Sequence, residues 1–182
     1  MPVKVYSAAK ATFPLKGQAR EQAWKTLTEM FRDPHASSYQ RGHWPIDPVI
    51  VDDDGPNVGA VFFCFSGMGS NRFVEIKEWK PLESFSYESA YPRNIDDIVD
   101  RTDIPGTNAE AAKKAIAEST TKRRMDFSLA ARGADTIVTI VRREKADVGM
   151  FGGKKNLAKE NLEFILGSNI AVERADHLRN NF

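Results

Sequence analysis

The chain has 182 residues, of which 41% are hydrophobic and 28% are charged. This length suits one well-buried domain, and the composition is ordinary for a soluble globular protein. A formal net charge of +1 gives no support for binding to nucleic acid or to an acidic membrane surface. The sequence shows neither a signal peptide nor the roughly 20 consecutive apolar residues of a membrane span. We therefore expect a cytoplasmic protein that is not integral to a membrane.

The first part of the chain predicts a strand followed by a helix. Residues 3–13 are rich in β-branched and aromatic residues, and Pro14 and Gly17 are expected to end this strand. Between residues 18 and 31 the apolar residues recur at helical spacing. Pro34 then stops the helix, because the residue before a proline is disfavoured in the helical region.

The middle of the chain predicts a series of antiparallel strands, expected at 49–51, 58–65, 72–79 and 85–91. The strand at 58–65 does not alternate between apolar and polar residues. It has two apolar faces, one formed by Val61, Phe63 and Phe65 and the other by Ala60, Phe62 and Cys64. Both faces of this strand must therefore be covered.

Residues 92–121 interrupt the strand pattern with an acidic stretch and an alanine-rich helix that Thr107 or Asn108 would cap. About thirty residues is long for a connection within a sheet, and such segments are usually functional or mobile. Two interpretations stay open. The segment is either a lid over a cavity mouth, or a surface element that covers the sheet or forms a dimer contact.

The remainder predicts a hairpin and a long helix. Strands are expected at 124–131 and 136–143, joined by RGAD, and a helix is expected from about 156 to 179. We expect Asp126 to point outward, because a buried unpaired carboxylate is costly. The basic residues at 122–124 are interpreted as the solvated start of a strand.

This order of elements resembles the START-like superfamily, also called SRPBCC or polyketide cyclase/dehydrase-like. The resemblance is carried by the helix sequence AREQAWKTLTEM, by HWP at 43–45, by GPNVGAVF at 55–62, and by the strand pairs FVEIKEWKPLESFSYES and RGADTIVTIVRR. It covers most of the chain except 92–121. It implies an α+β helix-grip fold in a single domain spanning 1–182. In that fold a curved antiparallel β-sheet of six to seven strands wraps around a long C-terminal α-helix, here with a helical insertion between late strands.

The resemblance also implies an elongated apolar cavity between sheet and helix. Such cavities bind lipids, polyketides, sterols or aromatic molecules, so the first hypothesis is a carrier or sensor of a hydrophobic small molecule. The residues expected to bind the ligand are aromatic or aliphatic: Trp44, Phe63, Phe65, Phe127, Leu162, Ile165 and Leu166. A homodimer is left open.

The second hypothesis is an enzyme of the polyketide cyclase or aromatase kind, in which polar groups of the cavity orient a chain of carbonyl groups and move protons. Its candidate catalytic residues are His43, Arg72 and Glu75, with Tyr39 and Tyr87 beside them. A simpler interpretation makes His43 an exposed loop residue and Glu75 part of a solvated charge row. A third hypothesis is a protein-interaction module.

Several other motifs do not support a cofactor. GMGSNR lacks the third glycine of a dinucleotide-binding turn, and GGKK at 152–155 fails the phosphate-loop pattern at both ends. The three histidines have no metal-ligand spacing, so we expect no metal and no cofactor. Cys64 is the one cysteine, which excludes an intrachain disulfide, and we expect it to be a small buried apolar residue.

Overall fold

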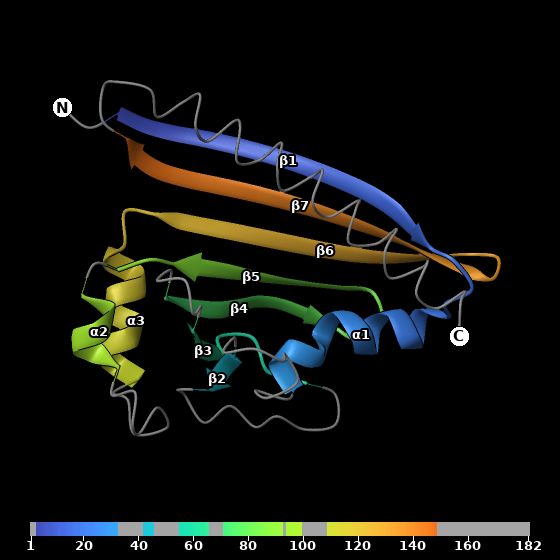
Figure 1. The fold of residues 1–182 in the computed structure, drawn as a ribbon, viewed down its shortest axis with the longest axis horizontal. Coiled ribbons are helices and arrows are strands. Elements are labelled where there is room, and N and C mark those ends of the chain that lie inside the picture. Colours follow the sequence, from blue (N-terminus) through green and yellow to red (C-terminus); the bar gives the residue numbers. More distant parts are fainter. Residues whose placement is uncertain are drawn as a thin grey trace.

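The computed structural model describes residues 3–32, 42–45, 55–65, 71–92, 94–99 and 109–148. In these ranges seven strands form one antiparallel sheet in the order β1-β7-β6-β5-β4-β3-β2 (Figure 1). The strands are β1 (Val3–Leu15), β2 (Gly42–Pro45), β3 (Val61–Phe65), β4 (Arg72–Lys80), β5 (Ser84–Ala90), β6 (Lys122–Arg132) and β7 (Asp135–Val148). The helices are α1 (Arg20–Arg32), α2 (Ile95–Ile98) and α3 (Ala109–Glu118). The strand predicted at 49–51 and the helix predicted at 156–179 lie outside the described residues.

The first strand is longer than the sequence predicts. Pro14 does not end β1 but pairs with Ile137, and the strand continues to Leu15. The expectation was wrong because β1 is an edge strand, where a proline whose nitrogen faces away from the ladder costs no hydrogen bond. The turn that follows has Gly17 at φ 65°, and the Gly17 N–H donates to Oδ1 of Asp135 at 2.8 Å.

The sheet has two faces, which we call the α1 face and the α3 face after the helices that pack on them. β3 presents Phe62 and Cys64 to the α1 face, and Val61 and Phe63 to the α3 face. All four side chains are at most 3% exposed. The two-sided apolar strand predicted from the sequence is therefore buried on both sides.

The α3 face of β3 is covered by the segment between β5 and β6. Val61, Phe63 and Phe73 form one buried cluster with residues of α2 and α3, among them Ile95 and Ala112. In Figure 1 this helix pair lies at the left end of the sheet, whereas α1 lies at the right. The described part of the segment thus packs on a sheet face, and a role as a lid stays a prediction.

The α1 face is held by aromatic contacts from the helix. Trp24 meets the rings of Trp79 and Phe85 edge-on at 5.2 and 5.5 Å, and Phe31 meets Phe62 and Tyr87 edge-on at 5.4 Å each. Edge-to-face pairs at these distances are favourable beyond their buried area. The aromatic cluster therefore fixes α1 against β3, β4 and β5.

Trp79 reaches this cluster because β4 is irregular. Its pairing with β5 shifts between Ile76 and Glu78, so that Ile76 opposes Tyr87 while Trp79 opposes Phe85. An extra residue in one strand makes the side chains that follow it point to the opposite face of the sheet. A regular strand would have kept Trp79 on the same face as Phe73, so this irregularity turns Trp79 toward α1.

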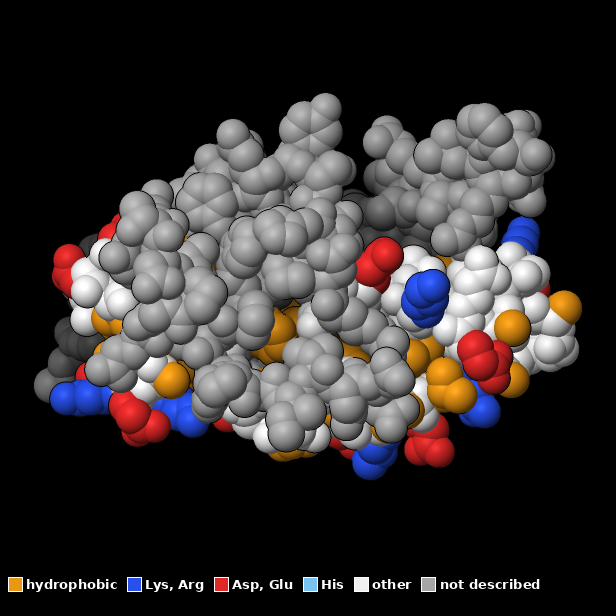
Figure 2. Space-filling model, turned by 90° about the horizontal axis from the view of Figure 1, so that it is seen from below, with side chains coloured by type: hydrophobic (Ala, Val, Ile, Leu, Met, Phe, Trp, Pro, Cys, Tyr) orange, Lys and Arg blue, Asp and Glu red, His pale blue; other side chains and the backbone are white. Residues whose placement is uncertain are grey.

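The rest of the α3 face carries ion pairs. Glu75 pairs with Lys77 at 2.7 Å, as the simpler interpretation of Glu75 expected. Asp126 lies on the same face, as predicted, where it pairs with Arg124 and Arg143. Acidic and basic side chains are also interspersed along the rim of the view in Figure 2.

Gly55 is expected to be sensitive to substitution because Trp79 occupies the space of a side chain. Gly55 has φ 107°, and an added Cβ would lie 2.3 Å from a ring carbon of Trp79. Gly55→Ala should lower the free energy of unfolding by about 2–5 kcal/mol, the sum of backbone strain and overpacking. Urea denaturation measures this loss.

Gly59→Ala is the matched control. Gly59 has φ 90° but open space around its Cβ position, so only the strain of about 1–2 kcal/mol should remain. Equal losses for the two variants would contradict the packing of Trp79 on Gly55.

Candidate functional site

The α1 face carries apolar side chains along most of its strands and polar side chains at one end. Next to α1 it carries Phe13, Leu15, Phe85, Phe127 and Leu129, all buried. Ala11 lies in the same row of the ladder as Phe127, whereas Ala9, Ser89 and Cys64 lie opposite Arg142, Arg123 and Arg72. The small buried side chains of this end are therefore interspersed with large polar ones.

A row of chemically reactive residue types crosses the sheet at this end. His43 pairs with Cys64, and Cys64 pairs with Arg72, across β2, β3 and β4. Opposite residues in an antiparallel ladder share a face, so Cys64 and Arg72 belong to the α1 face. Cys64 is buried and has a free thiol. Its sequence neighbours are phenylalanines, but its cross-strand neighbour Arg72 is a cation.

The strongest polar feature of the α1 face is a cluster on β6 and β7. Arg123 donates to Glu144 through Nε at 3.2 Å and through Nη2 at 3.1 Å. Arg142 donates through Nη2 to Oε2 of the same carboxylate at 2.9 Å. The third nitrogen of Arg123, Nη1, donates to the Tyr91 hydroxyl at 3.1 Å, and its guanidinium lies 5.4 Å from the Tyr91 ring centre.

The electrostatics of this cluster favour a charged carboxylate. Burial alone would raise the pKa of Glu144, but hydrogen bonds and charge attraction from Arg123 and Arg142 outweigh burial and lower that pKa. Burial raises the pKa of Tyr87 from its usual value near 10 to about 12, although Arg72 and Arg123 act in the opposite direction. Both arginines are therefore within electrostatic reach of the Tyr87 hydroxyl.

We call Arg72, Tyr91, Arg123, Arg142 and Glu144 the polar end of the α1 face. Among the described side chains it holds three guanidinium groups and one carboxylate. The side chains of Arg142 and Glu144 are only 7% and 6% exposed. An arrangement of this kind can bind an anion or orient a carbonyl oxygen, because arginine keeps its charge when buried.

The structure separates the residues predicted to bind a ligand. Phe127 lies on the α1 face, stacked on Phe85 at 4.4 Å, whereas Phe63 lies on the opposite face under α2 and α3. Trp44 pairs with Phe63 in the ladder, and Phe65 pairs with Gly42. Phe63 and Phe127 therefore do not face one common cavity. Leu162, Ile165 and Leu166 lie outside the described residues.

The predicted catalytic residues are separated as well. Arg72 and Tyr87 lie on the α1 face, and His43 holds a register position opposite Cys64. Glu75 pairs with Val61 and so belongs to the α3 face, away from Arg72. Tyr39 lies outside the described residues. Their catalytic role stays a prediction.

Sequence reasoning missed the cluster around Glu144. The interpretation of 122–124 as a solvated strand start was wrong for Arg123, whose side chain is 27% exposed and bound to Glu144. The signal was the two-residue period of a strand. Arg123 lies two and four residues from Met125 and Phe127, and Glu144 lies two residues from Arg142, so each shares a face with those neighbours. Polar residues in phase with an apolar face indicate a functional position on that face.

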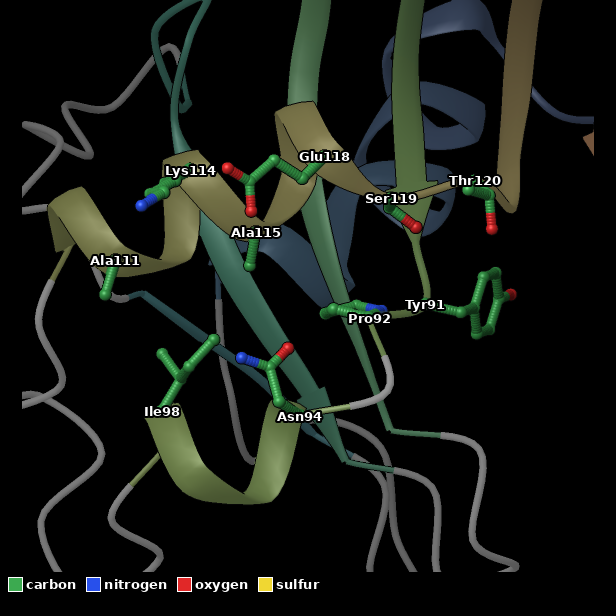
Figure 3. A pocket seen from close by; sticks show the side chains of 10 residues that line it. All are labelled: Tyr91, Pro92, Asn94, Ile98, Ala111, Lys114, Ala115, Glu118, Ser119 and Thr120. Carbon is green, nitrogen blue, oxygen red and sulfur yellow. The ribbon is translucent and has the colours of Figure 1, made fainter.

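A separate hollow of about 600 Å³ lies between α2 and α3. Figure 3 shows Ile98 and Asn94 on one side of it, and Lys114, Ala115 and Glu118 on the other. Tyr91 also lines this hollow, which places the hollow next to the polar end of the α1 face. Neither Phe63 nor Phe127, the two predicted ligand-binding residues whose side chains the structure describes, lines it.

The described residues contain no group of three potential metal ligands among histidine, cysteine, aspartate and glutamate. In the same residues, no helix has the length and apolar character needed to cross a membrane.

The fold can now be compared with those of known proteins. No protein-family model and no curated protein matches the sequence. Solved structures match across almost the whole chain. The protein SA2116 from Staphylococcus aureus has a TM-score of 0.59 at 7% identity, with 98% of each chain covered. Ara h 8.0201 has a TM-score of 0.55 at 8% identity, covering 96% of this chain and 98% of its own.

A third match is norcoclaurine synthase from Thalictrum flavum in complex with dopamine and hydroxybenzaldehyde. It has a TM-score of 0.51 at 8% identity, with 95% of this chain and 84% of that chain covered. The described residues have the helix-grip fold of these structures. The fold class predicted from the sequence is thereby confirmed, while identities of this size establish the fold alone.

Tyr87 should ionise only well above pH 10 in the folded protein. Because burial raises its pKa to about 12, the stability from keeping it neutral is present below pH 10 and is lost as the pH rises through 12. Absorbance titration of the four tyrosines should show a fraction still protonated at about pH 11, and Tyr87→Phe should remove that fraction. If Tyr87→Phe instead removed a part of the absorbance change that titrates near pH 10, the burial of the Tyr87 hydroxyl would be contradicted.

Glu144→Gln should be costly because it leaves two arginines without their carboxylate. We expect a loss of about 2–4 kcal/mol in the free energy of unfolding near neutral pH. The pKa of Glu144 is lowered by folding, so its contribution is present above the unfolded pKa of 4.5 and is lost as the pH falls through the folded value. The difference between variant and wild type should therefore shrink in acid.

Asp126→Asn provides the control for this measurement. Asp126 also lies between two arginines, but on the α3 face, where the Arg143 side chain is 56% exposed. Its loss should cost at most about 1 kcal/mol, as for other exposed pairs. An equal cost for both variants would contradict the distinction between the two faces.

Proposed function

We propose that the protein binds a hydrophobic small molecule on the α1 face, as a carrier or sensor. The observation that carries the proposal is that one buried sheet face carries both an aromatic cluster and a group of polar side chains. Small buried residues adjoin the polar end, because Ala9, Ser89 and Cys64 lie opposite Arg142, Arg123 and Arg72 in the ladder. A ligand there would have an apolar floor, aromatic rings at one end and polar groups at the other, as small-molecule sites usually do.

The extent of α1 supports this placement. Thirteen helical residues span about 20 Å, whereas the fourteen residues of β7 span about 46 Å. α1 therefore cannot cover the whole face. The norcoclaurine synthase complex, which has the same fold, holds two aromatic molecules, and this agrees with a binding role for the fold.

A second candidate function is an enzyme of the polyketide cyclase or aromatase kind. It is favoured by Cys64 and Arg72, which lie on the same face as Tyr87, and by the register position of His43 opposite Cys64. Native mass spectrometry of the protein from its own host, followed by organic extraction, would identify the bound molecule. Recovery of that molecule unchanged after incubation supports the carrier, and its conversion supports the enzyme.

The proposal predicts that an uncharged apolar dye binds to the α1 face. Nile red fluorescence should rise on titration with the wild-type protein. Ala9→Phe places a large ring over the small positions and should weaken Nile red binding about tenfold or more, the equivalent of about 1.4 kcal/mol. Because Ala9 is buried, the larger ring should also lower the free energy of unfolding, by about 1–3 kcal/mol.

Ala8→Phe is the matched control. Ala8 is the preceding residue of β1 and is exposed, while Ala9 is 7% exposed. Nile red should bind Ala8→Phe like the wild type. Absence of Nile red binding to the wild type, or unaltered binding to Ala9→Phe, would overturn the proposed function.

A further inference from the structure

The hollow between α2 and α3 has the features of a second ligand site, beside the α1 face. Its volume of about 600 Å³ lies within the usual range of small-molecule sites. We propose that it binds a zwitterionic molecule of the size of a dipeptide, with the ammonium group of the ligand at Glu118 and its carboxylate at Lys114. This inference goes beyond the proposed function and does not depend on it.

The first argument is the placement of two opposite charges on one wall of the hollow. α3 turns one side toward it, formed by Ala111, Lys114, Ala115 and Glu118 at helical spacing. In the part of the chain that the structure describes, neither Lys114 nor Glu118 forms an ion pair, although they lie four residues apart on one helix. Each of the two charges can therefore meet an opposite charge of a ligand.

The second argument is the chemistry at each end of this wall. Glu118 lies in the last turn of α3, which contains no basic residue, and the carbonyl groups at a helix C-terminus also favour a positive charge. The neighbouring Ser119 hydroxyl donates its hydrogen to the Thr121 carbonyl at 2.9 Å, so its oxygen can only accept a bond from a ligand. This end suits an ammonium group. Lys114 lies one turn earlier, where an anion complements its charge.

The third argument is the match in length. Lys114 and Glu118 are four residues apart, so their Cα atoms are separated by about 6 Å along the helix axis. The two ends of an extended dipeptide lie about 7 Å apart, whereas those of a single amino acid are separated by roughly half of that distance. Between the two charges the wall carries the small Ala115, and Ile98 faces it from α2 (Figure 3). These apolar residues can accommodate the aliphatic side chains of a dipeptide.

The experiment compares leucylleucine with two blocked forms of the same dipeptide. N-acetyl-leucylleucine lacks the ammonium group, and leucylleucine amide lacks the carboxylate. Each compound is titrated into the isotope-labelled full chain while the backbone amide signals are recorded by NMR. We expect leucylleucine to shift the signals of the residues that line the hollow. Each blocked form should bind about three- to fivefold more weakly, as the strength of other exposed ion pairs implies.

Two variants distinguish the two ends of the ligand. Lys114→Met should bind leucylleucine and its amide equally, but should still discriminate against the acetylated form. Glu118→Gln should bind leucylleucine and the acetylated form equally, but should still discriminate against the amide. Both side chains are exposed, so neither variant should lose its fold. Lys113→Met is the matched control, because Lys113 is also exposed on α3 but does not line the hollow, and it should keep both preferences.

The wild-type titrations decide the inference first. Equal binding of the three compounds, signal shifts confined to residues outside the hollow, or no shift at all would each overturn it. Preferences that persist unchanged in Lys114→Met and in Glu118→Gln would overturn it as well. None of these results bears on Nile red binding to the α1 face, so the proposed function is tested separately.

Discussion

The structure depends on one constraint, which is that β3 is apolar on both faces. Phe62 and Cys64 on one side and Val61 and Phe63 on the other are almost completely buried. A strand of this kind cannot lie at a solvated surface, so each face needs its own cover. α1 supplies the cover on one face through Phe31, and α2 and α3 supply it on the other. The long connection between β5 and β6 thus has a structural reason.

The two covers are displaced along the sheet, and this displacement positions the candidate site. α1 packs where β4 and β5 carry Trp79 and Phe85, while α2 and α3 pack near Phe73 and Ala90, at the other end of the same strands. On β3 the two covers lie back to back, because Phe31 of α1 packs on Phe62, whereas on β4 and β5 the α1 face opposite Phe73 and Ala90 lies beyond Trp79 and Phe85. A site built there rests on rigid strands, which hold side chains more precisely than loops do.

Much of this could be predicted from the sequence. Strand and helix periods place α1, β4 and the hairpin of β6 and β7 within a few residues, and the order of elements indicates the fold. The period shows which residues of one strand share a face, but not which face of the sheet that is. It therefore could not predict whether Phe62 or Phe63 shares a face with Phe127. It also could not predict the irregularity after Ile76, which turns Trp79 toward α1. Contacts between strands, such as that of Arg123 with Glu144, depend on register and need the structure.

The buried pair of Arg142 and Glu144 is the feature that fold stability explains least. A buried ion pair recovers in attraction about what it loses in desolvation, and apolar residues of similar volume often stabilise a protein as well or better. Arg142 and Glu144 occupy positions on β7 that continue the apolar series of Val138 and Ile140 on the same face. Apolar side chains there would extend the core without a charge to balance. The pair is held instead by hydrogen bonds, because Glu144 accepts from both Arg142 and Arg123 and Arg123 in turn donates to Tyr91, which links β7 and β6 to the end of β5.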